Sequence, residues 1–280
     1  MTGIDTAMTG SQSSMSRATF AEFRSLIYRL SGIALGEGKE GLVRSRVSKR
    51  MRLLGLQDYD AYLDQLLSDP SGEEIIHLLD VISTNVTSFF REESHFQFLS
   101  ELARRGLVEK RGRLRLWSAA CSTGEEPYSM AMTLLEAFEG RLVDVKILAT
   151  DLSTRALDRA RAGLYDAERT ACIPRDLRAR YFLRDARHLS MLRAGPELRR
   201  TVSFARLNLA EVPFPMSGPF DVVFCRNVMI YFDAAVRRRL LAQIHHLLRP
   251  GGHLFVGHSE SLSGLGAGFK TVQASVYVKT

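Results

Sequence analysis

The alternation of strand-like and helix-like segments after residue 112 limits the fold of this chain more than any other feature. Strands are expected at 113–117, 145–150, 201–205, 220–224, 253–256 and 272–278, with helices at 127–138, 153–162 and 234–248. Such alternation is typical of an α/β fold with a doubly wound, mostly parallel, Rossmann-like sheet. The segment 184–200 interrupts the pattern, so a small β insertion is expected there.

Residues 17–84 are expected to form a small all-α N-terminal domain. Phe20, Phe23, Ile27 and Leu30 recur at three- and four-residue spacing, which is the pattern of an amphipathic helix. Residues 1–16 are rich in Ser, Thr and Gly and lack the basic and apolar regions of a signal peptide, so a disordered tail is expected. Residues 85–106 then connect the helices to a sheet domain at 107–280.

Charge and cysteine content narrow the class of protein. The 280 residues include 38 Lys and Arg against 31 Asp and Glu, a net charge of +7. This surplus favours acidic partners but does not distinguish nucleic acid, anionic lipid and acidic protein. No run approaches about 20 apolar residues, so no membrane span is expected. The three cysteines form no CxxC pair, so we expect a reducing cytoplasm, no disulfide framework and no metal.

A basic stripe lies on the second expected helix, at about 40–54. It consists of Arg44, Arg46, Lys49, Arg50 and Arg52. Two interpretations stay open at this point: an ordinary solvated helix face, or a docking surface for an acidic partner.

In a parallel sheet of this kind, ligands bind at the carboxyl ends of the strands. The first strand runs into a loop of small residues, but the G-x-G-x-x-G dinucleotide fingerprint is absent because Gly124 is its only glycine. Glu125 and Glu126 start the next helix, where they would repel a pyrophosphate. An amine-bearing ligand fits better, unless both acids only complement the helix dipole.

The next two strand ends carry polar residues that suit a nucleoside. Asp151 closes the second strand, where an acid accepts hydrogen bonds from ribose hydroxyls, although such an Asp can also cap the following helix. Asn208 follows the third strand, and its amide matches an adenine edge, although an Asn there is often a turn residue.

The fourth strand leads into Arg226 and Asn227, which are expected beside the reaction centre, and Tyr231 could reach the same cleft. The alternative is that the apolar residues of this run pack in the core and the polar ones are incidental. A ligand with adenine, ribose and an amine but no phosphate is S-adenosylmethionine (SAM). Its carboxylate needs a basic residue, and Arg91 in the connecting segment is the best candidate.

Four runs of residues together resemble the chemotaxis receptor methyltransferase family, CheR. They are NVTSFFRE at 85–92, WSAACSTGEEPYS at 117–129, FCRNVMIYF at 224–232 and GHSES at 257–261. The runs occur in the family's order, and the resemblance extends from about residue 20 to the C-terminus.

The resemblance implies SAM-dependent methyl esterification of glutamate side chains on methyl-accepting chemotaxis receptors in a bacterial cytoplasm, with S-adenosylhomocysteine as the other product. It also implies a helical N-terminal domain and a SAM-binding domain with a β insertion. The implied SAM contacts are Asn85, Thr87, Arg91, Glu126, Asp151, Asn208, Leu209, Arg226 and Asn227. Family members place Arg91 and Tyr231 close to the transferred methyl group.

On this hypothesis Arg44, Arg46, Lys49 and Arg50 face acidic receptor helices, and the chain meets a membrane only through receptors. Two alternatives remain. A nucleic-acid methyltransferase would agree with the positive charge, but no N-P-P-[YF] loop follows the fourth strand and no aromatic platform accompanies the basic stripe. A non-catalytic SAM-binding regulator is the other.

Overall fold

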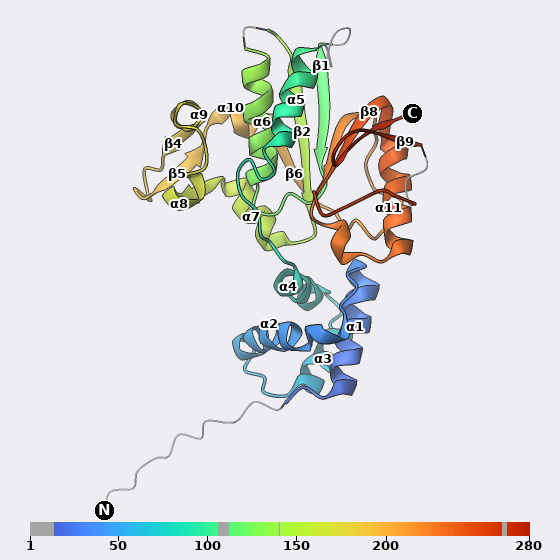
Figure 1. Ribbon diagram of the computed structural model, residues 1–280. Coiled ribbons are helices and arrows are strands. Elements are labelled where there is room, and N and C mark those ends of the chain that lie inside the picture. Colours follow the sequence, from blue (N-terminus) through green and yellow to red (C-terminus); the bar gives the residue numbers. More distant parts are fainter. Residues whose placement is uncertain (1–13, 106–111, 140, 265–267) are drawn as a thin grey trace, which may run out of the picture. The chain divides into compact units, whose positions relative to one another are not determined.

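The computed structural model describes residues 14–105, 112–139, 141–264 and 268–280. The chain divides into two compact units, one formed by residues up to 30 with 34–84, the other by 31–33 with 85–280. Figure 1 shows the elements of each unit. Of the tail expected at 1–16, residues 1–13 lie outside the described residues. No helix in the described ranges is long and apolar enough to cross a membrane.

The N-terminal unit is built from helices. They are α1 (Arg17–Ser31), the short 3-10 helix η1 (Glu37–Lys39), α2 (Glu40–Leu53), α3 (Tyr59–Ser68) and α4 (Glu73–Ile82). α2 buries Val43, Val47 and Met51, which lie at four-residue spacing on one face. The all-α domain expected from the sequence is therefore confirmed.

The second unit contains a seven-stranded sheet in the order β6-β2-β1-β7-β8-β10-β9. The strands are β1 (Arg113–Ser118), β2 (Asp144–Asp151), β6 (Val202–Arg206), β7 (Phe220–Cys225), β8 (Leu248–Val256), β9 (Phe269–Gln273) and β10 (Val276–Lys279). β6, β2, β1, β7 and β8 run parallel, while β10 pairs in the antiparallel sense with both β8 and β9. The expected doubly wound sheet is confirmed.

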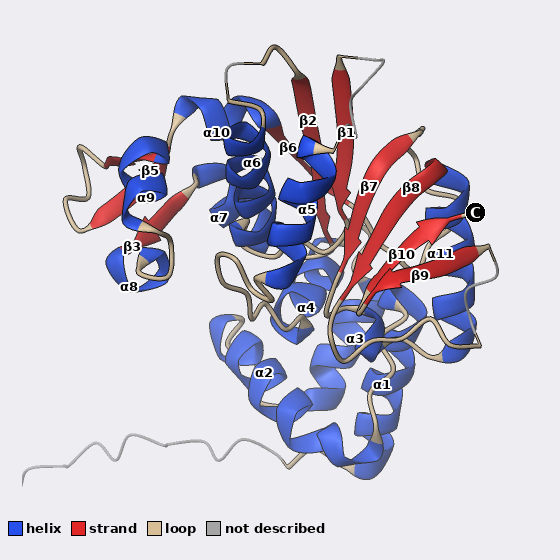
Figure 2. Ribbon diagram, turned by 45° about the horizontal axis from the view of Figure 1, so that its top comes forward, coloured by secondary structure: helices blue, strands red, loops and turns tan. Residues whose placement is uncertain are grey.

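Helices cover both faces of this sheet, as Figure 2 shows. They are α5 (Ser94–Arg104), α6 (Glu125–Ala137), α7 (Thr154–Ala162), α10 (Pro196–Thr201) and α11 (Ala234–Leu247). Successive residues of a strand point to opposite faces, so Val222 and Phe224 join the core under α5 and α6. Val223 and Cys225 join the core under α11. Burial on both faces explains why β7 has an uninterrupted apolar run after Asp221.

Two expectations about the strands were wrong in detail. The single last strand expected at 272–278 is a hairpin of β9 and β10, because the chain turns at Ser275, whose φ is +60°. The insertion is also larger than 184–200. It forms a separate sheet in the order β3-β5-β4, made of β3 (Leu164–Asp166), β4 (Phe182–Arg184) and β5 (Met191–Ala194), with α8 (Ala167–Thr170) and α9 (Arg175–Tyr181). Strands of three residues are too short to show a readable periodicity.

Candidate active site

The strand order places a candidate site at the point where the order of the strands along the chain reverses. β1 lies between β2 and β7, so the chain winds toward β6 on one side and toward β8 on the other. The crevice at such a switch point is where α/β sheets bind ligands. The loop after β1 makes a tight turn there: Gly124 has a φ of +96°, and a Cβ on it would lie 2.8 Å from the Tyr165 hydroxyl and 2.9 Å from the Ala160 Cβ. Only glycine fits this position without displacement of its neighbours.

Asp151 joins the ends of β1 and β2 at this switch point. Its Oδ2 accepts the backbone N–H of Ser122 at 2.8 Å, and its Oδ1 accepts that of Ser153 at 2.9 Å. Ser153 itself caps α7, since its Oγ accepts the N–H of Ala156. The carboxylate of Asp151 therefore fixes the loop that would face the ligand, and a carboxylate oxygen can accept a further hydrogen bond.

Arg226, at the end of β7, is a buried cation held between two carboxylates. Its side chain is 1% exposed, and its two terminal nitrogens lie 3.0 Å from Glu126 Oε2 and 3.0 Å from Glu92 Oε2. The rings of Phe96 and Phe224 lie beside the guanidinium, each with its centroid 5.6 Å away. Glu126 thus does more than complement a helix dipole, because it is paired with a buried charge and also accepts a hydrogen bond from Ser118.

The two carboxylates differ in electrostatic environment. Burial raises the pKa of Glu126, and the attraction of Arg226 offsets this only in part. Burial also acts on Glu92, but the charge of Arg226 and hydrogen bonds from Asn227 and Arg226 outweigh it and hold the pKa of Glu92 below its ordinary value. The two acids therefore compensate the buried charge of Arg226, so that the guanidinium does not oppose a cationic ligand beside it.

Glu92 belongs to the segment 85–93, which is attached to the sheet domain at several points. The ring of Phe89 is buried with its centroid 4.9 Å from that of Tyr165. The N–H of Phe90 donates to Ser129 Oγ of α6 at 3.0 Å. The carbonyl oxygen of Arg91 accepts a hydrogen bond from Arg226. The segment expected to connect the two domains therefore forms one wall of the site in the second unit.

Glu260 organises the turn that follows β7. Its Oε2 accepts the N–H groups of Asn227 at 2.8 Å and Gly257 at 2.6 Å, and its Oε1 accepts those of Val228 at 3.0 Å and Ile230 at 3.3 Å. The side chain is 8% exposed. Asn227 has a φ of +56°, in the left-handed region, and the carboxylate stabilises that conformation by binding the backbone on both sides of it.

The other predicted contacts in the segment 85–93 lie near this wall. Asn85, Thr87 and Arg91 are all half-buried. The guanidinium of Arg91 donates to the carbonyl oxygen of Val86 at 2.9 Å, so it folds back onto its own loop. A carbonyl oxygen carries no net charge, so this hydrogen bond does not compensate the positive charge of Arg91.

Asn208, Leu209 and Tyr231 lie in the loops after β6 and β7. Asn208 shapes a turn, because its Oδ1 accepts the N–H of Ala210 at 3.1 Å and its Nδ2 donates to Glu211 Oε1 at 2.8 Å. Leu209 is buried and belongs to the core under α11. Tyr231 ends the short 3-10 helix η2 (Met229–Tyr231) and is half-buried.

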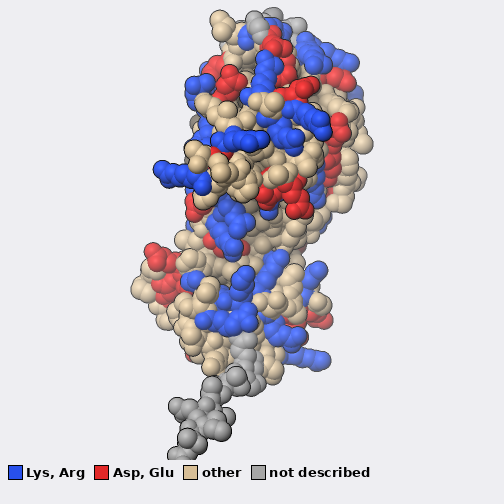
Figure 3. Space-filling model, turned by 90° about the vertical axis from the view of Figure 1, so that its left-hand side faces the viewer, with Lys and Arg blue, Asp and Glu red and all other residues tan. Residues whose placement is uncertain are grey.

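The basic stripe on α2 separates into two groups. Arg44, Lys49 and Arg52 are exposed, and Figure 3 shows Lys and Arg side chains gathered on the N-terminal unit. Arg46 instead binds the carbonyl oxygens of Ile82 and Ser83. Arg50 forms a two-pronged ion pair with Glu74, at 2.9 and 2.6 Å. Two of the four residues assigned to docking thus have internal partners that stabilise the helices.

Sequence reasoning did not assign a role to Glu92 or Glu260, although both lie in runs that carry the family resemblance. A lone acid in a loop gives no signal by itself, since most are solvated. The available signal was position: Glu92 follows an apolar pair of phenylalanines, and Glu260 follows the buried carboxyl end of β8. An acid at such a place needs partners when it is buried.

Comparison with known proteins identifies the family. Residues 18–83 match the model described as CheR methyltransferase, all-alpha domain, and residues 85–278 match CheR methyltransferase, SAM binding domain. Chemotaxis protein methyltransferase 2 of Pseudomonas aeruginosa is 44% identical over 262 residues, which cover 93% of this chain and 92% of that protein. The chemotaxis protein methyltransferase of Escherichia coli is 41% identical over 94% of this chain and 91% of its own length. That of Klebsiella aerogenes is 41% identical over 94% and 90%.

These matches favour a chemotaxis protein methyltransferase over the two alternatives, a nucleic-acid methyltransferase and a non-catalytic regulator. They span both units, and the SAM-binding model covers the segment 85–93, the switch point and the Glu260 turn described above. The chain is therefore a SAM-dependent methyltransferase that belongs to the CheR family.

Proposed function

We propose that this chain transfers the methyl group of SAM to glutamate side chains of methyl-accepting chemotaxis receptors in a bacterial cytoplasm. The observation that carries the proposal is the match to chemotaxis protein methyltransferases at 44% and 41% identity over more than nine-tenths of the chain. The pairing of Arg226 with two carboxylates, which compensates its positive charge, supports binding of a cationic donor nearby.

The proposed SAM contacts follow the order of the strand ends. Asp151 would accept hydrogen bonds from the ribose, while Asn208 and Leu209 would contact the adenine. The acidic surroundings of Arg226, with Glu126 and Asn227, would hold the amine. Arg91 would pair with the SAM carboxylate, with Asn85 and Thr87 beside it in the same segment.

The reaction needs positioning more than proton transfer. The acceptor glutamate, with an ordinary pKa of about 4.3, is already ionised at neutral pH. Its oxygen attacks the methyl carbon in line with the C–S bond, which breaks as the C–O bond forms, and the sulfonium becomes the neutral thioether of S-adenosylhomocysteine. Charge is neutralised in the transition state, so a dry pocket and near-attack alignment both accelerate the reaction. Arg91 and Tyr231 orient the reactants on this account.

Receptor docking is proposed for the exposed part of the basic stripe, Arg44, Lys49 and Arg52, against acidic receptor helices. Exposed charges steer association without large gains in affinity. Arg46 and Arg50, which were also assigned to docking, have internal partners, and Glu74 compensates the charge of Arg50.

The test is transfer of labelled methyl groups from SAM to membranes that contain receptors. Label that alkali releases as methanol identifies a methyl ester, and receptors with the methylated glutamates changed to alanine should take up none. Alkali-stable label, or label in nucleic acid, would refute the proposal. Tyr231→Phe and Arg91→Ala should lower turnover at saturating SAM, and unchanged turnover would remove their positioning role.

A further inference from the structure

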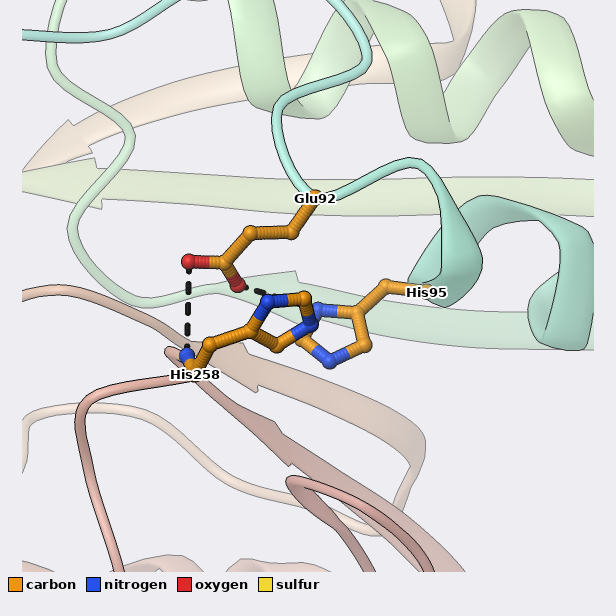
Figure 4. Close-up of side chains that lie close together, drawn as sticks. All are labelled: Glu92, His95 and His258. Carbon is orange, nitrogen blue, oxygen red and sulfur yellow. Dashed lines mark hydrogen bonds and ion pairs between the residues drawn. The ribbon is translucent and has the colours of Figure 1, made fainter.

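Three side chains with metal-binding atoms lie close together, as Figure 4 shows, and one of them, Glu92, is paired with the buried Arg226. They are Glu92 from the segment 85–93, His95 from the first turn of α5 and His258 from the turn after β8. One ligand atom from each lies within 4.8 Å of the other two. The rings of His95 and His258 are nearly perpendicular, with centroids 5.0 Å apart.

His95 is unusual because it is fully buried and unsatisfied. Its relative exposure is 0%, and neither ring nitrogen has a hydrogen-bond partner among the described residues. Nδ1 lies 3.5 Å from Glu92 Oε2, too far for a good hydrogen bond. A buried polar group without a partner destabilises the folded state, so the position calls for an explanation.

We propose that Glu92, His95 and His258 form a binding site for a divalent transition metal ion, with Zn²⁺ as the best match. Two imidazoles and one carboxylate are a typical zinc ligand set that leaves a fourth position for water. Zinc–ligand distances of about 2.0–2.2 Å require the three ligand atoms to approach one another more closely than they do here. His258 is exposed in its turn, and the movement would cost its ring the 3.5 Å hydrogen bond between Nε2 and Ser94 Oγ.

The site is coupled to Arg226 through Glu92. Oε2 of Glu92 faces His95 and also accepts a hydrogen bond from Arg226. An ion bound to that oxygen competes with the guanidinium and repels it. If Arg226 contributes to SAM binding, as the proposed function holds, zinc must weaken SAM binding, and SAM must weaken zinc binding by the same factor. The site would thus act as an inhibitory one.

The experiment measures zinc binding by competition with a chromophoric chelator, using tag-free protein without SAM. The wild type should bind one Zn²⁺ more tightly than His258→Ala by about 100-fold or more, since even loss of a residue that only supports a ligand costs 10- to 100-fold. His188→Ala removes an exposed histidine of the insertion and should match the wild type. Equal binding by the wild type and His258→Ala would overturn the proposal.

Two further readouts separate this site from the proposed function. His95→Phe keeps a buried ring, and it should lose zinc binding while remaining folded by circular dichroism; retained binding in that variant would also overturn the proposal. SAM affinity is then titrated with and without Zn²⁺. A zinc-dependent loss of SAM affinity that His258→Ala abolishes supports the coupling, and its absence refutes the inhibitory role. The zinc stoichiometry is measured without SAM, so the result on the zinc site holds even if the chain does not bind SAM.

Discussion

Replacing Glu260 tests whether a carboxylate that touches neither proposed reactant holds the site in shape. Glu260→Ala removes the acceptor of four backbone N–H groups, three of them in the turn that presents Arg226 and Asn227. Glu260→Gln is the more specific test of the carboxylate. Each carboxylate oxygen accepts two N–H groups, so whichever way the amide is oriented, its NH₂ group must face two donors.

The magnitude follows from these bonds. A hydrogen bond to a charged group contributes about 1.5–3 kcal/mol. Water can replace part of the loss at the half-buried Asn227 and Val228 and at the exposed Ile230, so the four bonds do not add. We expect Glu260→Ala to lower the free energy of unfolding by about 2–4 kcal/mol. Glu260→Gln should lower it by about 1–3 kcal/mol because one acceptor oxygen remains.

The assays are urea unfolding and calorimetric titration with SAM, each on the folded full chain. Both variants should bind SAM at least tenfold more weakly, because Asn227 is no longer stabilised in its left-handed conformation. Ser261→Ala, a change at the neighbouring exposed residue, should stay within about 0.5 kcal/mol of the wild type in stability. If Glu260→Gln matches Ser261→Ala in both assays, the carboxylate does not organise the turn.

The remaining predictions concern one residue set each. Burial raises the pKa of Glu74, but the hydrogen bonds and charge of Arg50 outweigh it and hold that pKa below its ordinary value. The pair's stabilisation is therefore present above the unfolded pKa of about 4.3 and is lost as the pH falls through the lower folded pKa, so urea unfolding of Glu74→Gln should depend less on pH below 5. Asp151→Ala should weaken SAM binding by about 2–3 kcal/mol, or roughly 30- to 160-fold, in a calorimetric titration; an unchanged affinity would contradict the assigned role. Lys49→Glu should weaken binding to receptor-containing membranes in a salt-dependent way and leave SAM affinity intact, whereas Arg238→Glu on α11 should change neither.

The central sheet could be predicted from the sequence because its middle strands have strong apolar patterns. β7 is buried throughout, and β1 and β2 are buried toward their carboxyl ends, so the site follows from these strand ends. The expectation that Asp151, Arg226 and Asn227 would lie at one sheet edge rests on that topology alone.

The parts that could not be predicted depend on tertiary partners. β3 and β4 have three residues each and exist as strands only because both pair with β5. The hairpin of β9 and β10 requires a positive φ at Ser275. Glycine or asparagine is the usual sequence signal for such a conformation, and serine is not. Likewise, the sequence shows that Arg46 and Arg50 are basic but not that their guanidinium groups are already bound within the helical unit.

The most direct test of the account is calorimetric titration of SAM into the purified chain, with folding checked by thermal unfolding. The crevice at the carboxyl ends of β1, β2 and β7 predicts one SAM per chain and a large loss of affinity in Asp151→Ala. Folded wild-type protein that takes up no SAM, or that binds it equally well without the Asp151 carboxylate, would contradict it.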